Sequence, residues 1–273
     1  MKLLSSFLGV LVTSSLASGQ SFNVAIGPTD QQPSATYAAA GLAGYWNALP
    51  ADNNSTTLNL RSIDGAVTNI SMWQYGGTEL RHTNDPGTSG DDEKLMDYCL
   101  VTYTPGVETC LFFYGLQLGD YEVLTYAWMP AAPTVMSYTS SDEEPGNPHR
   151  IIGGAWPGAQ QETITFSRII CKLTPSDGTL KVHSGIVPGN NAALGAACNG
   201  IQIRALPPRT PGDMNCDGVV TAADIPGFAQ ALISPAAYYS AHPSCRIDNA
   251  DVNSDGQRTP ADVPQFVAML LAS

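Results

Sequence analysis

Positive charge is scarce in this chain of 273 residues, which has 12 Lys and Arg against 24 Asp and Glu and a formal net charge of −12. A protein that binds nucleic acid needs basic side chains on the phosphates, and no basic stripe is present to supply them. Charged residues of both signs make up only 13% of the chain, whereas there are 26 Gly and 20 Pro. This composition is typical of a loop-rich β protein and excludes nucleic acid as an expected partner.

Long apolar segments are also missing, because no stretch approaches the roughly 20 residues that span a bilayer. The apolar run Leu3–Val12 follows Lys2 and precedes small residues at Ser15, Ala17 and Gly19, which is typical of a secretory signal peptide. We therefore predict a signal at residues 1–19, no membrane span, and a mature protein that is secreted to the extracellular space or the periplasm. The length leaves room for about two domains.

The sequence has none of the common catalytic motifs, neither G-x-S-x-G nor H-E-x-x-H nor a P-loop. We therefore assign no catalytic residue and favour a non-catalytic protein. A polysaccharide-degrading glycoside hydrolase stays open as an alternative, with Glu93, Asp97 and Glu162 as candidate acids. The acidic run 91–97 is more typical of a solvated loop, and Asp97 is also a candidate for a third calcium site.

Metal-ligand spacing among His and Cys is missing too. The histidines at 82, 149, 183 and 242 are scattered, so we expect surface or strand positions for them, and no C-x-x-C pair is present. Six cysteines in an exported chain instead predict a disulfide framework. Our hypothesis is sequential pairing: Cys99–Cys110 across two neighbouring strand-like runs, Cys171–Cys198, and Cys216–Cys245 as a staple for a small C-terminal module.

Short alternating runs separated by Gly- and Pro-containing turns fill residues 20–206. The predicted strands are 57–60, 66–75, 95–103, 109–114, 121–128, 134–138, 150–153, 162–173, 179–183 and 200–205. Around ten short strands at this spacing predict a mainly β fold, a sandwich of two sheets. No long segment with a helical period occurs before residue 222.

Three stretches of the sandwich region carry a family resemblance. They are Leu116-x-x-Gly119-x-Tyr121-x-Val123, Asp177–Val182 and Asn199–Ile203. In this order they resemble the galactose-binding-like jelly roll. The resemblance implies a jelly-roll sandwich for residues 20–206.

Residues 207–211, Pro-Pro-Arg-Thr-Pro, predict a short extended linker and a domain boundary. Beyond it the segment Asp213–Asp224 reappears 38 positions later as Asp251–Asp262. Each copy has oxygen-bearing side chains at loop positions 1, 3, 5, 9 and 12 and Gly at position 6, which is the spacing of an EF-hand calcium loop. We predict two Ca²⁺ ions with the ligands Asp213, Asn215, Asp217, Val219, Thr221 and Asp224, then Asp251, Asn253, Asp255, Gln257, Thr259 and Asp262, where Val219 and Gln257 use backbone carbonyls.

A predicted helix follows each loop. Thr221 and Thr259 are expected N-caps, and Pro226 and Pro264 predict a distorted first turn. The expected apolar faces are Ile225, Phe228, Ala229 and Leu232 in the first copy, and Val263, Phe266, Val267 and Leu270 in the second.

A duplicated loop followed by a helix, with Asp at position 12, resembles the type I dockerin module over residues 212–273. The resemblance implies two calcium ions, two antiparallel helices, and docking to a cohesin-like or cell-surface protein. Loop positions 10 and 11 hold Ala222-Ala223 and Pro260-Ala261 in place of the small hydroxyl residues of cohesin-binding dockerins. The docking partner therefore stays open.

Aromatic residues supply candidates for a ligand site. Trp156, Trp73 and Trp128 lie near turns or strand ends, where flat rings stack on sugars. The alternative for each is a core position between the sheets. Together these features predict an exported, calcium-binding modular protein whose tail anchors a β-sandwich that binds carbohydrate or another surface ligand. A purely structural cell-surface protein is the further alternative.

Overall fold

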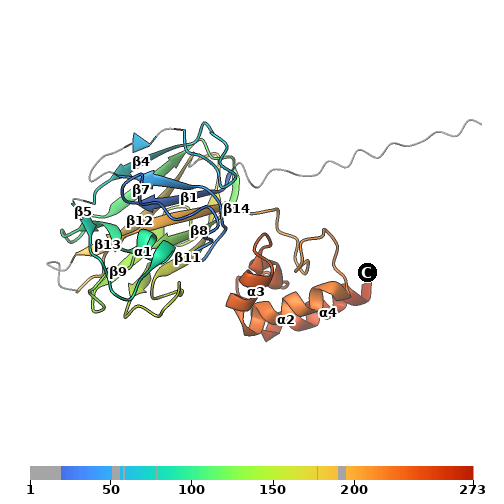
Figure 1. Ribbon diagram of the computed structural model, residues 1–273. Helices are drawn as coiled ribbons and strands as arrows, with labels where there is room; N and C mark the ends of the chain where they lie inside the picture. Colours follow the sequence, from blue (N-terminus) through green and yellow to red (C-terminus); the bar gives the residue numbers. More distant parts are fainter. Residues whose placement is uncertain are drawn as a thin grey trace, which may run out of the picture.

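The computed structural model describes residues 20–50, 56–57, 59–77, 79–176, 178–189 and 195–272. The predicted signal peptide at 1–19 and Asp177 of the jelly-roll motif lie outside the described residues. The fold is mainly β, as the composition and the turn signals predict, and helices are concentrated after residue 222 (Figure 1).

Two large sheets form the main body. The first has the order β11 (Phe166–Leu173), β8 (Gly119–Tyr126), β14 (Gly200–Ala205), β1 (Phe22–Ile26) and β2 (Trp46–Leu49). The second has the order β10 (Arg150–Gly153), β9 (Met136–Ser141), β12 (Thr179–Ile186), β7 (Thr109–Tyr114), β4 (Ser71–Tyr75) and β3 (Thr56–Thr57). Neighbouring strands are antiparallel in both sheets except for the parallel pair β1 and β2.

The main core lies between these two sheets. In β7, Leu111 and Phe113 are buried, whereas Phe112 is half-buried and Tyr114 is exposed, so that alternate side chains enter the core. They pack with Phe22 of β1 and Val123 of β8 from the other sheet. The alternation thus defines an inner face and an outer face on the six-stranded sheet.

A third sheet corrects the prediction of a sandwich with two sheets alone. It has the order β13 (Ala196–Cys198), β6 (Tyr98–Thr102) and β5 (Glu79–His82). The predicted strand 95–103 begins with a helix, α1 (Gly90–Met96), whose first turn carries Asp91, Asp92 and Glu93 where the helix dipole favours negative charge. At seven residues, α1 is too short to show a helical period in the sequence.

The C-terminal part, residues 212–272, is called the tail below. It contains α2 (Ile225–Ile233), α3 (Pro235–Ala241) and α4 (Val263–Ala272). Short 3₁₀ turns, Ala222–Asp224 and Pro260–Asp262, precede α2 and α4. Pro226 thus falls in the first turn of α2, where no helical amide is needed, and the predicted distortion of the first turn is confirmed. The sequence did not predict α3.

The helix faces differ in part from their prediction. Phe228 and Phe266 are buried and stack with ring centroids 3.9 Å apart, which joins the two repeats at equivalent positions. Ile225 and Val263, by contrast, are 47% and 40% exposed. The buried face of α2 runs through Gly227, Phe228 and Ala231, because the 3₁₀ turn rotates the helix relative to a regular start. Ala229 and Val267 are also exposed, against the prediction.

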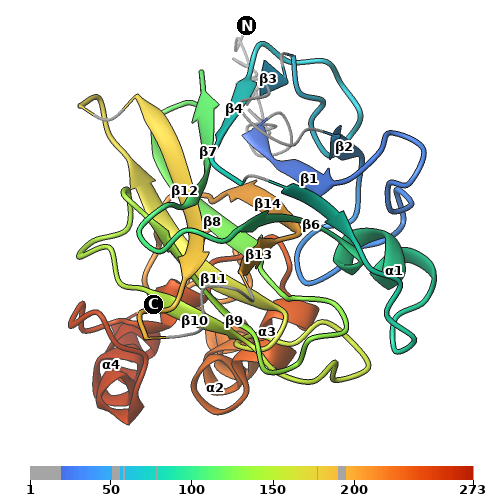
Figure 2. The same ribbon diagram turned by 90° about the vertical axis from the view of Figure 1, so that its left-hand side faces the viewer.

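Three arginines connect the sandwich to the tail, and this contact is called the seam. Arg246 of the tail lies 2.7 Å from the carboxylate of Asp120 at the start of β8. Arg204 of β14 donates to the Cys245 carbonyl at 3.3 Å, and the guanidinium of Arg168 of β11 lies 3.6 Å from the Tyr239 ring centroid. Figure 2 shows α3 beside this end of the sandwich. Glu122 pairs with both Arg168 and Arg204, at 2.8 and 3.2 Å.

Among the described residues, no helix combines the length and the apolar character that crossing a membrane requires.

Candidate functional site

The two loops of the tail have the same backbone design. Gly218 and Gly256 at position 6 have φ of 93° and 83°, and at position 4 Cys216 and Ser254 have φ of 57° and 60°. Position 6 is glycine because this left-handed conformation strains residues with a Cβ atom. In each loop the amide of position 6 donates to the carboxylate of position 1, at 3.0 Å to Asp213 and 3.2 Å to Asp251.

The aspartate at position 12 closes each loop. Asp224 accepts from the amides of Met214 at 2.7 Å and Thr221 at 2.8 Å. Asp262 accepts from the amide of Thr259 at 2.9 Å. Both aspartates are fully buried, and both belong to capping boxes with the predicted N-caps Thr221 and Thr259. The helix starts therefore fix the closing carboxylates.

The donor chemistry of the loops fits a hard divalent cation. Calcium takes six to eight oxygen ligands, and each loop offers carboxylates, an Asn amide, a Thr hydroxyl and a backbone carbonyl. Oδ1 of Asp213 is buried and accepts no hydrogen bond. A buried oxygen without a donor costs about 1–3 kcal/mol, which a cation at this position removes.

The loop carboxylates are not drawn tightly together. Among the described residues, Glu108, Cys110 and His183 form the one group of three or more His, Cys, Asp or Glu whose ligand atoms all lie within 4.8 Å of one another. In the loops, carboxylates of Asp217 and Asp255 at position 5 instead accept from the amides of Val219 and Gln257, at 3.0 and 2.8 Å. A cation bound in either loop would therefore have to draw the carboxylates of that loop closer together.

One of the three predicted disulfides is present. Cys216 and Cys245 are bonded, with Cα atoms 5.6 Å apart, and the bond links the first loop to the segment before the second. The pairings Cys99–Cys110 and Cys171–Cys198 are wrong, since all four of these residues are free and buried.

The strands explain why those two pairs do not form. Cys99 of β6 packs with Val101 and Ala197 in a cluster under the third sheet, whereas Cys110 of β7 points to the outer face of the six-stranded sheet. Cys171 and Cys198 lie in strands of different sheets, β11 and β13.

The three tryptophan candidates have different surroundings. Trp128 is 2% exposed and its indole donates to the Gly154 carbonyl at 2.9 Å. It is therefore a core residue, which was the alternative to a place in a ligand site. Trp156 is half-buried against Trp128, with ring centroids 5.3 Å apart. Trp73 of β4 is half-buried on the outer face of the six-stranded sheet.

Trp73 belongs to a group of aromatic rings on that outer face. It stacks on Phe112 of β7 at 5.1 Å and lies 5.7 Å from Tyr75. Tyr75 and Tyr114 are 51% and 39% exposed. We call these four residues the aromatic face. An exposed cluster of rings on a regular sheet is typical of a binding surface, because such rings are otherwise placed in cores. The sequence could have indicated Tyr75, Phe112 and Tyr114, because each occupies a position of its strand that alternates with buried core residues.

Two of the three candidate acids, Asp97 and Glu162, make structural contacts. Asp97 is fully buried and accepts from the Thr88 hydroxyl at 2.8 Å and the Asp85 amide at 3.0 Å. Burial raises the pKa of Asp97 above its ordinary value, and these hydrogen bonds oppose the rise. Glu162 lies 3.6 Å from Arg168, whereas Glu93 is in α1.

The structure brings together one group that the sequence did not indicate. Cys110 of β7 and His183 of β12 are paired strand residues, and Sγ lies 3.1 Å from Nδ1. Glu108 lies 3.0 Å from the same nitrogen. Burial alone lowers the pKa of His183, but hydrogen bonds to Cys110 and Glu108 raise it to about 10. The hydrogen bond from His183 in turn lowers the pKa of Glu108 to about 2.

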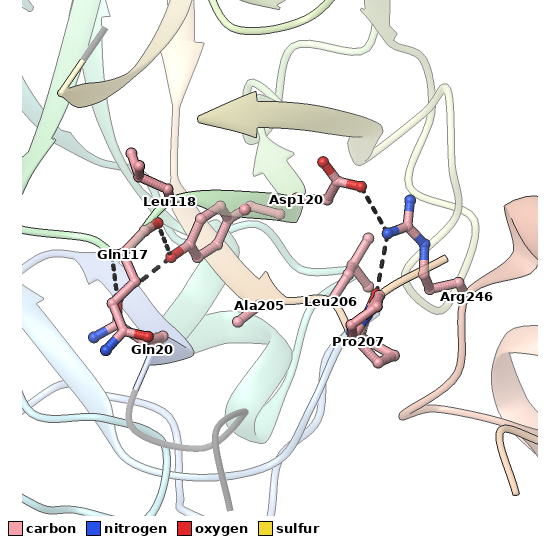
Figure 3. Close-up of a pocket in the computed structure, with 11 residues that line it drawn as sticks. Gln20, Gln117, Leu118, Asp120, Ala205, Leu206, Pro207 and Arg246 are labelled. Atoms are coloured by element: carbon pink, nitrogen blue, oxygen red, sulfur yellow. Dashed lines mark hydrogen bonds and ion pairs between the residues drawn. The ribbon is translucent and has the colours of Figure 1, made fainter. Parts of the chain in front are cut away.

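A hollow of about 360 Å³ lies at the seam. Figure 3 shows Arg246 directed to Asp120 and to the Pro207 carbonyl, with Leu118 and Gln117 farther along the wall. Its two charged side chains are thus paired with each other, so this hollow is part of the contact between the sandwich and the tail.

No family model matches the chain, and the search of curated proteins finds no match. Solved structures match with low similarity. A chain in the crystal structure of plant peptide RALF23 in complex with FER and LLG2 has 13% identity and a TM-score of 0.39, over 76% of this chain and 45% of that chain. The CBM36-1 domain of a multidomain xylanase from the hindgut metagenome of Trinervitermes trinervoides has 13% identity and a TM-score of 0.27, over 50% of this chain and 96% of that domain. CBM35 from Cellvibrio japonicus Abf62 has 11% identity and a TM-score of 0.27, over 46% and 83%. The match to the first of these spans less than half of that structure's chain.

Proposed function

We propose that the chain is an exported protein whose tail binds two calcium ions and anchors a β-sandwich that binds carbohydrate. The observation that carries the calcium assignment is the matched geometry of the two loops, together with the buried Oδ1 of Asp213 that accepts no hydrogen bond. The ligands are the twelve residues named from the sequence. The ion would supply charge compensation for three carboxylates in each loop.

The exposed apolar side chains of the tail support an anchoring role. Ile225 and Val263 are exposed at equivalent positions of the two repeats, and so are Ile233 and Leu271, each 83% exposed. Large apolar side chains that are exposed at the same positions in both repeats are candidates for contact with a partner, and we call these four residues the apolar stripe. We propose that this stripe meets a cohesin-like or cell-surface protein.

Calorimetry on the full chain tests the calcium assignment. After EDTA treatment, two calcium-binding events are expected. Asp217→Ala and Asp255→Ala should each remove one event, since both residues are exposed at position 5 and neither substitution opens the core. Asp30→Ala, an exposed aspartate outside the loops, should leave both. Absence of calcium binding in the EDTA-treated wild-type chain refutes the assignment.

The aromatic face supports carbohydrate as the ligand of the sandwich. Tyr75 and Tyr114 are exposed and Trp73 is half-buried beside them, so this face offers ring surface on which sugar rings can stack. Pull-down with a panel of insoluble polysaccharides should retain the wild-type chain on at least one of them. Trp73→Ala should reduce retention at least tenfold, whereas Tyr45→Ala, which removes an exposed ring elsewhere, should not. Equal loss in both variants, or no retention on any polysaccharide, rejects this part of the proposal.

A further inference from the structure

Cys110 and His183 project from the outer face of the six-stranded sheet, beside Tyr75 of the aromatic face. The pairing of β4, β7 and β12 places Tyr75, Cys110 and His183 side by side. Both side chains point outward because their neighbours Leu111 and Val182 are buried in the core. The 3.1 Å contact between Sγ and Nδ1 is therefore fixed by strand register and does not depend on a loop.

Glu108, directly before β7, completes a triangle of ligand atoms. Its Oε2 lies 3.0 Å from Nδ1 of His183 and 3.9 Å from Sγ of Cys110. The backbone here is held by a close approach to Gly76, whose φ is 70° and where an added Cβ atom would lie 1.9 Å from the Glu108 carbonyl oxygen. The position of Glu108 is thus also set by the fold.

The size of the triangle matches a tetrahedral metal ion. With Zn–S of about 2.3 Å and Zn–N and Zn–O of about 2.0–2.2 Å, tetrahedral geometry requires ligand separations of roughly 3.4–3.6 Å. The three observed separations are 3.1, 3.0 and 3.9 Å. Shifts of about half an ångström would therefore suffice to admit the ion.

Further contacts surround two of the three ligands, His183 and Glu108. Nε2 of His183 lies 3.2 Å from Oδ1 of Asp142, an ion-pair distance at which no hydrogen bond is made; metal binding would use this carboxylate as the partner of the second ring nitrogen. The Tyr138 hydroxyl donates to Oε1 of Glu108, which leaves Oε2 directed to the triangle. The Tyr138 ring lies over Gly185, where a Cβ atom would lie 2.6 Å from it, so no larger residue fits there.

A cysteine nucleophile activated by His183 is the competing interpretation. It requires Nδ1 of His183 to accept the thiol proton, but Glu108 lies 3.0 Å from this same nitrogen and competes for it. A metal ion uses all three groups. Burial raises the pKa of the other free cysteines, Cys99, Cys171 and Cys198, to about 12 and disfavours their thiolates.

We propose that Glu108, Cys110 and His183 form a binding site for one Zn²⁺ ion, with Asp142 as a positioning residue. One sulfur, one imidazole nitrogen and one carboxylate oxygen make up a donor set that zinc accepts, whereas calcium takes oxygen alone. Three protein ligands leave the fourth tetrahedral position open to water or to a ligand on the neighbouring aromatic face. This site is independent of the two calcium loops.

Metal titration of the full chain with calcium in excess tests the site, because calcium fills the loops and leaves the zinc site free. Zn²⁺ should bind with one-to-one stoichiometry. Co²⁺, as a spectroscopic substitute, should show a sulfur-to-cobalt charge-transfer band. Cys110→Ser and His183→Asn should abolish the band and weaken Zn²⁺ binding at least 100-fold. Asp142→Asn should weaken binding about 10–100-fold, the usual effect of removing a partner of a metal-bound histidine.

His82→Asn and Cys171→Ser serve as matched controls and should leave affinity and band unchanged. Circular dichroism shows whether each variant is folded. If Cys110→Ser unfolds, Glu108→Gln gives a second measurement, because it keeps the side-chain size at a half-buried position. Glu108→Gln should weaken Zn²⁺ binding at least tenfold. The proposal is overturned if the wild-type chain binds no Zn²⁺, or if the cobalt band persists in Cys110→Ser. It is equally overturned if Cys110 reacts with iodoacetamide at the same rate with and without Zn²⁺.

Discussion

Arg246 should be one of the strongest single determinants of the stability of the seam. Its side chain is 3% exposed and lies 2.7 Å from Asp120 of the sandwich and 2.6 Å from Asp248 of the tail. It also donates to the Pro207 carbonyl at 3.0 Å. Arg246→Ala removes all of these contacts at once.

The magnitude follows from the exposure of the partners. Breaking a fully buried ion pair costs about 3–5 kcal/mol, because a charge is left without compensation. Here Asp120 and Asp248 are 27% and 22% exposed, so water can hydrate part of each carboxylate after the substitution. We therefore expect the free energy of unfolding to fall by about 2–3 kcal/mol, below the full cost of a buried pair.

Urea unfolding of the calcium-loaded full chain measures this effect. Arg150→Ala is the matched control, since Arg150 pairs with Glu144 at 2.5 Å but is 38% exposed. Its loss should cost at most about 1 kcal/mol. A double-mutant cycle of Arg246→Ala with Asp120→Ala should give a coupling of about 1–2 kcal/mol. If Arg246→Ala costs no more than Arg150→Ala, or if the coupling is within error of zero, the seam is not held by this pair.

Three further predictions concern the tail and the buried acid. Calcium at about 100 times its dissociation constant should raise the free energy of unfolding by about 2.7 kcal/mol per site, and Asp255→Ala should halve this gain; a gain unchanged in the variant contradicts it. Replacing both Cys216 and Cys245 by Ser should lower the free energy of unfolding by about 3–4 kcal/mol, the chain-entropy value for a disulfide that spans 29 residues. If the wild-type chain is equally stable with and without reductant, the disulfide does not make this contribution. The pKa of Asp97 is raised in the folded chain, so the folded state holds the carboxyl proton more tightly than the unfolded chain does. This contribution to stability is complete below the ordinary pKa near 3.8 and is lost as pH rises through the raised pKa. The difference in unfolding free energy between wild type and Asp97→Asn should therefore fall as pH rises above 4, and a difference independent of pH refutes the assignment.

Local patterns explain which strands the sequence predicts. The bounds 109–114, 150–153 and 200–205 agree with β7, β10 and β14, since each run has turn residues at its ends. The strand β1 was missed because all five of its residues are buried, which leaves no alternation of apolar and polar positions. The strand β13 has three residues, too few for a period to be recognised.

The same distinction separates the proposed calcium loops from the proposed zinc site. All the ligands of a calcium loop fall within 12 residues, so a spacing rule detects them in the sequence alone. Cys110 and His183 are 73 residues apart, and their contact exists only because β7 and β12 pair in one register. A shift of one residue in either strand would turn the side chain of that strand, Cys110 or His183, to the core face and break the contact. The wrong prediction of a Cys99–Cys110 disulfide also comes from local reasoning, because it paired two cysteines that are close along the chain. The sheet instead directs the sulfur of Cys110 to His183, which no local pattern could indicate.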